Sequence, residues 1–282
     1  MSFSPTTTRE PVQARVLARQ QSERDYHQGY AAKNRHLAET PVNLDICTAP
    51  ARRWWNAYWA LYDRIRAASV AGLRVLVPGC GFGEDCLRLA ARGAAVHGTD
   101  LSPEIADIAE ARCRRFAARA PVISAMPCER MDYPRDYFDA VVLVNILHHV
   151  DIPCTMAELR RVVRPGGLVF GLEMYTHSLA QRVRQSRLVS GVLYPRMVRA
   201  VYGGDPYITP DERKLDETEL DFICGHLEHG RHDYFGLLAE RAFPNRMTGL
   251  CKADRVVAKA IGPLGRFAAG RVVFTGRMKA RR

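Results

Sequence analysis

The chain has 282 residues, of which 47% are apolar, so it can bury one substantial core with additions around it. Its eight cysteines are scattered without a Cys-x-x-Cys pair, which argues against a disulfide scaffold and against a structural zinc site. The net charge of +11 comes largely from arginine, but aromatic residues do not interleave with the arginines, which favours a solvated basic surface over a nucleic-acid footprint. A polar start and the absence of a long uncharged apolar stretch lead us to expect a soluble, cytoplasmic protein.

Two helices are predicted ahead of the core. A polar helical pattern covers Val12 to Leu37, and a second helix over Ala51 to Ala68 carries aromatic residues at helical spacing. Three of these aromatic residues, Trp55, Trp59 and Tyr62, are expected to pack against a sheet.

The most informative segment, Val75 to Asp85, is an apolar run that ends at Pro78 and leads through a glycine-rich turn into a helix start. The glycines of the turn stand at alternate positions and are Gly79, Gly81 and Gly83. Because they lack Cβ atoms, a ligand can approach the backbone closely, and the helix start offers N–H groups to an anionic group. A dinucleotide fingerprint would need a glycine in place of Glu84, and the absence of Gly-Lys-Ser or Gly-Lys-Thr excludes a P-loop.

Strands and helices alternate after this turn. The predicted strands are 73–77, 95–99, 121–125, 138–144 and 168–174, and the predicted helices are 85–91, 103–117 and 152–163. This alternation predicts a parallel sheet covered on both faces, which binds ligands beyond the carboxyl ends of its strands. Asp100 stands at such an end, about 20 residues past the glycines, where an acid accepts hydrogen bonds from ribose hydroxyls.

Four motifs in register resemble those of class I S-adenosylmethionine-dependent methyltransferases. They are Val75 to Gly83, Asp100, Phe138 to Asn145 and Arg164 to Gly167. The later motifs are similar to those of the ubiquinone and menaquinone biosynthesis methyltransferases, and the residues of the glycine motif are similar to those of thiopurine methyltransferases. The resemblance implies an enzyme with an α/β, Rossmann-like, doubly wound and mostly parallel seven-stranded sheet. An N-terminal helical lid and an inserted helical cap would complete it.

The resemblance also implies S-adenosyl-L-methionine as the cofactor. The glycine turn would lie against its methionine part, Asp100 on the ribose, Leu101 on an adenine face and Asn145 beneath the sulfonium. The implied cofactor-binding set is Gly79, Cys80, Gly81, Gly83, Asp100, Leu101, Cys128, Glu129 and Asn145. Two positions depart from the family pattern, since Val77 and Pro127 stand where acids are usual.

A lid and a catalytic base are predicted from the flanks of these motifs. In the resembling family the N-terminal segment folds over the cofactor, which makes Tyr26, His27 and Tyr30 candidates for the lid. Transfer from a sulfonium mainly requires a positioned acceptor, and a base near neutral pKa helps when the acceptor bears a proton. We predict His148 as that base and a structural role for His149, while a purely structural role for either histidine stays open.

The C-terminal half is predicted to close the site and complete the sheet. The basic, apolar segment Val183 to Tyr202 favours a cap helix over a membrane-surface helix or a dimer interface, and Gly203 to Pro206 favours a hinge. A helix start at Leu215 to Glu217, a helix near 252–260 and a strand at 272–275 would supply the antiparallel part. The trio His226, His229 and His232 favours a polar, partly exposed element over a metal site.

The predicted organisation is therefore a tail and helical lid over 1–70, a cofactor-binding core over 71–175, a substrate cap over 176–215 and a C-terminal completion over 216–282. The predicted function is methyl transfer to an oxygen or carbon of a small organic metabolite of secondary-metabolite, quinone or prenyl type. Asn145 is not followed by the Pro-Pro-aromatic turn of nucleobase N-methylation, and no acid cluster suggests a magnesium site. The alternatives are an RNA-directed methyltransferase and a cofactor-binding protein without transferase activity. An apolar or anionic acceptor, the methylated atom, peripheral membrane contact and homo-oligomers stay open.

Overall fold

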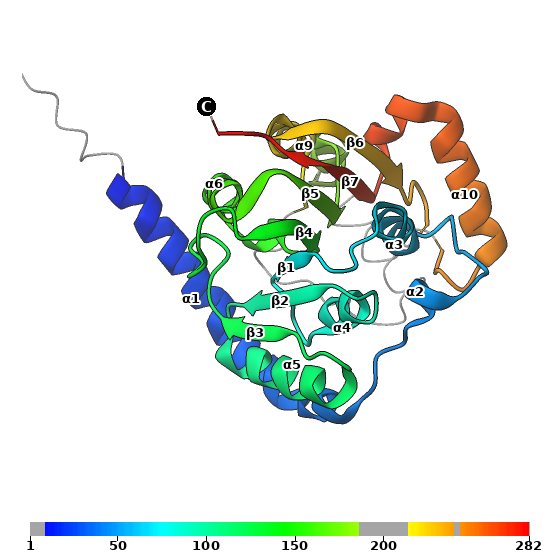
Figure 1. Ribbon diagram of the computed structural model, residues 1–282. Helices are drawn as coiled ribbons and strands as arrows, with labels where there is room; N and C mark the ends of the chain where they lie inside the picture. Colours follow the sequence, from blue (N-terminus) through cyan, green and yellow to red (C-terminus); the bar gives the residue numbers. More distant parts are fainter. Residues whose placement is uncertain (1–8, 186–213, 240–242, 282) are drawn as a thin grey trace, which may run out of the picture. The chain divides into compact units, whose positions relative to one another are not determined.

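The computed structural model describes residues 9–185, 214–239 and 243–281 of the chain (Figure 1). Its seven strands form one sheet in the order β3-β2-β1-β4-β5-β7-β6. The neighbouring pairs β1·β2, β1·β4 and β2·β3 are parallel, whereas β7 is antiparallel to both β5 and β6. The predicted Rossmann-like, mostly parallel seven-stranded sheet is thereby confirmed.

The chain is divided into two compact units. The described residues of the first unit fall within Met1–Leu44, Val70–Val142 and His149–Arg164. Those of the second fall within Asp45–Ser69, Leu143–His148 and Pro165–Arg282.

The first unit holds the glycine-rich turn. Its strands are β1 (Arg74–Pro78), β2 (Ala95–Asp100), β3 (Val122–Ala125) and most of β4 (Phe138–Val144). Its helices are α1 (Arg9–Lys33), η1 (Arg35–Glu39), α4 (Glu84–Ala90), α5 (Pro103–Phe116) and α6 (Ile152–Val162). β1 pairs with β2 from Arg74↔Ala95 to Pro78↔Thr99, so both strands end at the same edge, where the turn begins. The apolar run of β1 is fully buried, as expected for a parallel strand covered on both faces.

The second unit contains the antiparallel part of the sheet. Its strands are most of β5 (Val163–Met174), β6 (Leu227–Phe235) and β7 (Arg271–Met278). Its helices are α2 (Asp45–Thr48), α3 (Ala57–Ala68), α7 (Ser178–Gln185), α9 (Glu217–Gly225), α10 (Thr248–Ile261) and η4 (Gly262–Phe267), with most of η2 (Leu147–His149). β5 and β7 pair from Leu168↔Arg277 to Met174↔Arg271, and the Phe274 ring lies so close to Gly171 that an added Cβ would be 2.0 Å from it.

Both predicted N-terminal helices have different bounds in the structure. α1 ends at Lys33, because the Asn34 side chain donates a hydrogen bond to the Tyr30 carbonyl at 2.9 Å. This carbonyl of the last helical turn thereby gains a hydrogen-bond donor. α3 begins at Ala57 and not at Ala51, because Asn56 caps it by accepting from the backbone N–H groups of Tyr58 and Trp59.

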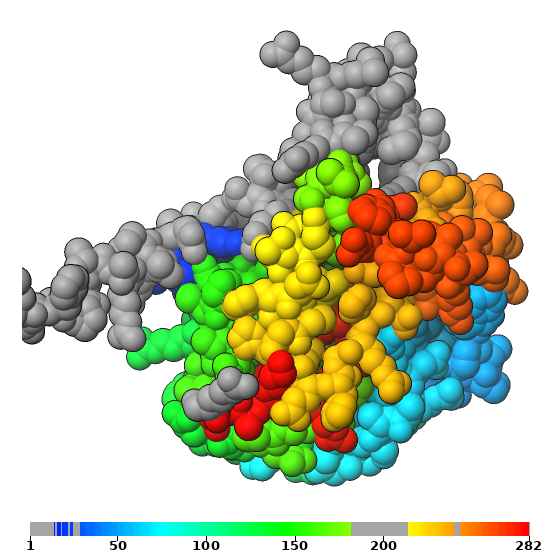
Figure 2. All heavy atoms as spheres, turned by 90° about the horizontal axis from the view of Figure 1, so that it is seen from above, coloured from blue at the N-terminus to red at the C-terminus, as the bar shows by residue number. Residues whose placement is uncertain are grey.

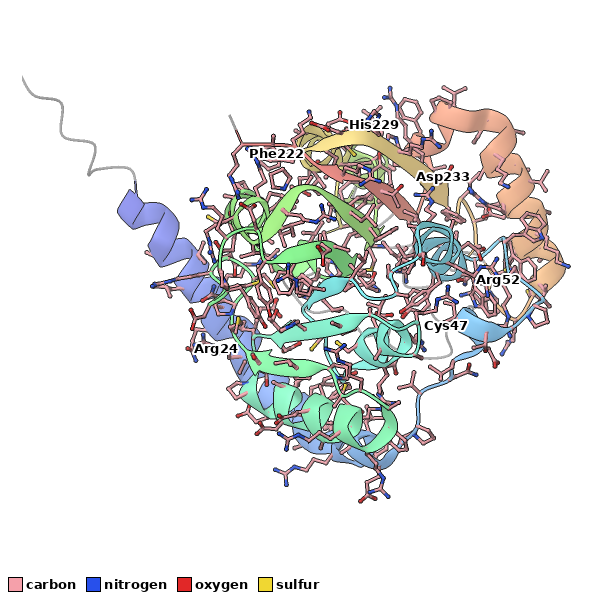
Figure 3. All side chains as sticks on the ribbon, viewed as in Figure 1. Arg24, Cys47, Arg52, Phe222, His229 and Asp233 are labelled. Carbon is pink, nitrogen blue, oxygen red and sulfur yellow. The ribbon has the colours of Figure 1, made fainter. Side chains whose placement is uncertain are left out.

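The residues just before α3 are held by side-chain contacts. Arg52, labelled in Figure 3, donates to Asp63 at 2.7 Å and to the Ile46 carbonyl at 2.9 Å. Of the three aromatic residues expected to pack against a sheet, Trp59 and Tyr62 are buried in a cluster with Ile46 and Cys47 of α2, and Trp55 is partly exposed.

Residues 186–213 hold most of the predicted cap and its Gly203 to Pro206 hinge, and they lie outside the described residues. Within the described part of the chain, no helix combines the length and the apolar character that crossing a bilayer requires.

Candidate functional site

The glycine-rich turn after β1 has three glycines with positive φ. Gly79, Gly81 and Gly83 have φ values of 62°, 51° and 78°, a left-handed conformation that residues with a Cβ rarely adopt. A Cβ on Gly81 would meet no atom within 4 Å, so the space beside this residue is open to a ligand. A Cβ on Gly83 would instead lie 3.0 Å from the Cys113 sulfur, so this glycine allows close packing on α5.

Asp100 joins the end of β2 to this turn. One carboxylate oxygen accepts from the Gly81 N–H and the other from the Ser102 N–H, each at 3.0 Å. The Cys80 N–H also donates to the Thr99 carbonyl at 2.8 Å, so the turn is fixed to β2 by two neighbouring contacts. Asp100 is buried, and its carboxylate lies at the end of β2 directly beside the glycine-rich turn.

Cys128 and Glu129, two members of the implied cofactor-binding set, lie in different surroundings. Cys128 is buried, and this burial is the main reason that the pKa of its thiol is well above its ordinary value. A hydrogen bond with the Gly79 backbone opposes the shift and places the thiol beside the turn. Glu129 accepts from the Gln20 side chain at 3.0 Å and from the Asp151 N–H at 3.1 Å. A contact between Glu129 and adenine would therefore compete with these two hydrogen bonds.

Helix α1 contacts the other elements of the first unit through apolar and polar side chains. The Tyr30 ring lies 5.6 Å from the Phe82 ring of the glycine-rich turn, measured between centroids. Nearer its start, Arg19 donates to the Val150 carbonyl at 3.2 Å, and Glu23 contacts the Nδ1 atom of His149 at 3.1 Å. Tyr30 therefore contacts the glycine-rich turn and its lid role stays a prediction, whereas the side chains of Tyr26 and His27 lie outside the described residues.

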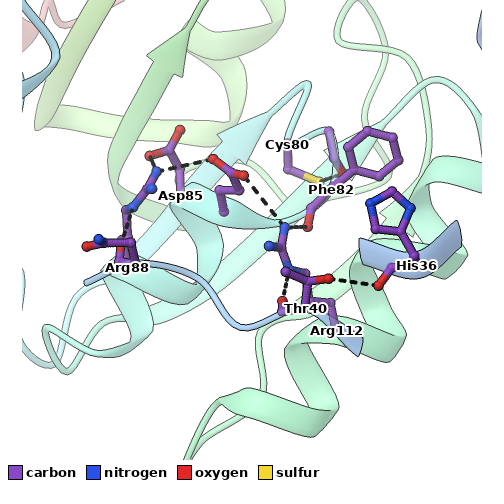
Figure 4. A network of polar contacts seen from close by, with 10 residues as sticks. His36, Thr40, Cys80, Phe82, Asp85, Arg88 and Arg112 are labelled. Carbon is purple, nitrogen blue, oxygen red and sulfur yellow. Dashed lines mark hydrogen bonds and ion pairs between the residues drawn. The ribbon is translucent and has the colours of Figure 1, made fainter. Parts of the chain in front are cut away.

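Arg112 on α5 is a buried residue that the sequence did not single out. Figure 4 shows its guanidinium between the chain after η1 and the glycine-rich turn. It donates to the Thr40 carbonyl at 2.8 Å and to the Phe82 carbonyl at 3.2 Å, and lies 3.7 Å from a Glu84 oxygen. An arginine in an amphipathic helix is normally solvated, so its sequence position carried no signal for this role.

In the second unit, Asn145 follows directly after β4. Its φ of 51° is in the left-handed region, which asparagine tolerates better than most residues. Its side-chain oxygen accepts from Arg271 of β7 at 3.0 Å, and its N–H donates to the Leu172 carbonyl at 2.9 Å. The residue is therefore held on both sides at the end of the strand.

His148 is paired with Glu173, an acid of β5 that sequence reasoning missed. The histidine Nδ1 lies 2.8 Å from one carboxylate oxygen of Glu173, and both side chains are almost completely buried. The other oxygen accepts from the N–H groups of Ile146 and Leu147 at 2.7 Å and 2.6 Å. An ionised carboxylate only accepts hydrogen bonds, so a pairing of this kind assigns the donor role to Nδ1. The sequence did contain a signal, namely a single acid within the apolar run of β5.

The histidine trio does not converge in this structure. His226 caps α9 and hydrogen-bonds the Phe222 carbonyl at 2.9 Å, while His229 and His232 lie on β6, where Figure 3 labels His229. Among the described residues, no group of three or more histidine, cysteine, aspartate or glutamate side chains is arranged to hold a metal ion.

The sequence matches a family model described as a methyltransferase domain over residues 76–171. The demethylmenaquinone methyltransferase of Tropheryma whipplei is 30% identical over 217 residues, which cover 67% of this chain and 88% of that protein. The ubiquinone biosynthesis O-methyltransferase of Dechloromonas aromatica is 34% identical over 141 residues, which cover 46% of this chain and 61% of that protein.

Solved structures show a similar fold. A putative methyltransferase of Haloferax volcanii, in complex with a methyltransferase activator, aligns with a TM-score of 0.54 and 18% identity over 92% of this chain and 98% of that one. The YcgJ protein of Bacillus subtilis aligns with a TM-score of 0.51 and 15% identity over 79% of this chain and 100% of that one. At these identities the likeness extends to the fold.

Proposed function

Because this chain belongs to the S-adenosylmethionine-dependent methyltransferase family, we propose that it methylates an oxygen or a carbon atom of a small quinone-type or prenyl-type molecule. The chain is an enzyme, and its cofactor is S-adenosyl-L-methionine. The names of its relatives support a quinone-type acceptor, since they include methyltransferases of demethylmenaquinone and of ubiquinone biosynthesis. The observation that carries the choice of oxygen or carbon is the buried pair of His148 and Glu173.

The glycine-rich turn fits this cofactor on two observations. The space beside Gly81 is open, and the Gly81 N–H holds the Asp100 carboxylate next to it, at a strand end where an acid is suited to bind ribose hydroxyls. We assign the methionine part to the turn, the ribose to Asp100 and the adenine surroundings to Leu101 and Cys128. When bound, S-adenosylmethionine supplies a methyl group on a positively charged sulfur that is already a good leaving group.

His148 is assigned the removal of a proton from the acceptor at its Nε2 atom. An acceptor hydroxyl or activated C–H group must lose a proton as it is methylated, and a nearby imidazole can take that proton near neutral pH. Glu173 acts through the histidine: it keeps the proton on Nδ1, fixes the ring orientation and stabilises the imidazolium that forms. It is a positioning residue, and His148 is the catalytic residue.

His148→Ala is expected to lower kcat about 10²-fold to 10⁴-fold, the usual contribution of a general base. The dissociation constant for S-adenosylmethionine, measured by calorimetry, should stay within about twofold because a base contributes to proton transfer and not to ground-state binding. Turnover close to that of the wild type would exclude His148 as the base.

The acceptor class is tested by incubating the full chain with methyl-labelled S-adenosylmethionine and three candidate acceptors. These are a demethylated naphthoquinol with a prenyl chain, a prenylated catechol and bulk RNA. Label on either small molecule supports the proposal, and mass spectrometry then identifies the methylated atom. Label that accumulates on RNA alone would overturn it.

A further inference from the structure

The outward face of α10 is apolar along its length. The residues that α10 buries are Cys251, Asp254, Arg255 and Ala258, which recur at helical spacing on one side. On the other side Leu250, Val256 and Val257 are 49%, 56% and 51% exposed. Gly249, Ala253 and Ala260 are exposed as well, so an apolar strip runs along this side of the helix. We call these six residues, Gly249, Leu250, Ala253, Val256, Val257 and Ala260, the α10 face.

The apolar surface continues past the end of the helix. Leu264 in η4 is 65% exposed and Phe267 is also exposed, and Met247 is exposed directly before α10. Figure 2 shows the orange and orange-red atoms of α10 and η4 on the outside of their unit. Exposed apolar side chains that join into one patch are typical of an interaction site.

Basic side chains border this surface. The ammonium groups of Lys252 and Lys259 lie 4.8 Å and 5.6 Å from the ring centroids of Trp55 and Trp54. The acid of the helix, Asp254, is turned inward, where it accepts from the N–H groups of Leu237 and Leu238 at 3.1 Å and 2.8 Å. Every exposed charged residue of α10 and η4 is consequently basic, and these residues are Lys252, Lys259 and Arg266.

We propose that the α10 face rests on the surface of a lipid bilayer that contains anionic lipids. A helix of 14 residues is too short to span a bilayer, but one with an apolar side and flanking lysines can lie in the interfacial plane. Its apolar side chains then enter the acyl boundary, while the lysines reach the anionic headgroups and Trp54 stands at the level where tryptophan is enriched. The chain's net charge of +11 adds a long-range attraction of the same sign.

Charge favours a bilayer over a second copy of the chain as the occupant. A two-fold symmetric contact would place the same α10 face on both copies, so both sides of the contact would carry the same basic border. α10 itself exposes no acid that could pair with Lys252 or Lys259 of a second copy. An anionic membrane surface supplies that complementary charge directly.

Vesicle sedimentation with the full chain tests the proposal, and it needs no methyl acceptor. The wild type should bind vesicles of phosphatidylcholine with about a quarter phosphatidylglycerol at low salt, and bind pure phosphatidylcholine much more weakly. Val257→Glu and the double variant Lys252→Glu/Lys259→Glu should each lose binding to the anionic vesicles by about tenfold or more. The control is Val122→Glu, which changes a residue of β3 that is 52% exposed and should bind within about twofold of the wild type.

Three results would overturn the proposal. The first is that the wild type fails to bind either kind of vesicle. The second is that Val257→Glu binds as the wild type does, since binding would then use another surface. The third is a lipid-free dimer in sedimentation velocity that Val257→Glu dissociates, which would make the α10 face a protein interface. Thermal unfolding of each variant checks that an exposed substitution has left the fold intact.

Discussion

At the scale of single residues, the site is distinguished by side chains whose partners are distant in sequence. His148 could be selected from its position after a strand, but its pairing with Glu173 spans 25 residues and depends on β4 and β5 lying side by side. The sequence therefore predicted the candidate base and not the acid that orients it.

Glu173→Gln tests this orientation. The glutamine oxygen can still accept from the Ile146 and Leu147 N–H groups, but its NH₂ group would face the histidine and favour the proton on Nε2. We expect kcat to fall about 10²-fold to 10⁴-fold with little change in S-adenosylmethionine affinity, and Glu173→Asp to recover part of it.

The pH dependence of kcat should also change in Glu173→Gln, which a merely structural role for the acid would not cause. The matched control is Glu158→Gln, another acid that accepts a backbone N–H, from Met131 at 2.6 Å. An equal loss of kcat in both variants would argue that Glu173 only supports the fold.

Gly81 has a left-handed φ and also lies beside open space, and a pair of matched substitutions can separate the effects of these two properties. Gly81→Ala should cost about 1 kcal/mol of stability because its φ is left-handed, and its Cβ would enter the open space that we assign to the cofactor. S-adenosylmethionine affinity should therefore fall about tenfold or more in calorimetry. Gly166→Ala is the control, since Gly166 also has a left-handed φ of 72° and open space around it. Equal cofactor affinity in the two variants would contradict the assignment.

At the scale of elements, helix α1 is held in place by contacts with residues distant in sequence and not by a continuous apolar side of its own. It lacks a continuous apolar side, and its partners are Glu129, His149, Val150 and the apolar cluster of Ala31 with Ile105 and Ile108. A sequence pattern could predict that α1 is a helix, but these partners are more than 70 residues away along the chain.

Arg112 of α5 connects the chain after η1 to the glycine-rich turn. Arg112→Ala should destabilise the chain by about 2 kcal/mol because two buried carbonyl groups would lose a charged donor. Arg112→Lys should recover little, since a lysine cannot reproduce the fork that reaches both Thr40 and Phe82. Arg114→Ala is the control on the same helix: its side chain is 71% exposed, and it pairs with Glu110. Urea unfolding of Arg114→Ala should show a loss in the free energy of unfolding below about 0.5 kcal/mol. An equal loss in Arg112→Ala and Arg114→Ala would count against the role of Arg112.

At the scale of the whole molecule, stability should depend on acids whose pKa is lowered. Burial by itself raises the pKa of Glu158, but hydrogen bonds from Arg161 and the Met131 N–H outweigh it and bring the pKa below its ordinary value of 4.5. Burial is likewise opposed at Asp139, where the Arg74 N–H and Arg164 bring the pKa below 3.8. Each acid holds its proton more weakly in the folded chain than in the unfolded chain.

A lowered folded-state pKa contributes stability that is present above the ordinary value and is lost as the pH falls through the folded-state value. The urea midpoint should therefore be flat near neutral pH and decline once the pH drops below 4.5 and then 3.8. The double variant Asp139→Asn/Glu158→Gln should show a shallower decline over the same range. An unchanged slope would mean that other groups govern acid unfolding.

The sequence by itself determined the features that short stretches of chain decide. The glycine-rich turn, the end of β1 at Pro78, the alternation of strands and helices and the cofactor family all follow from residues close together in sequence. Only the tertiary structure decided the pairing of His148 with Glu173, the burial of Arg112 and the outward apolar face of α10. The reason is physical: local spacing restricts backbone conformation, whereas burial and side-chain partners depend on which distant elements pack together. A helix such as α10 shows which of its sides is exposed only when the rest of its unit is in place.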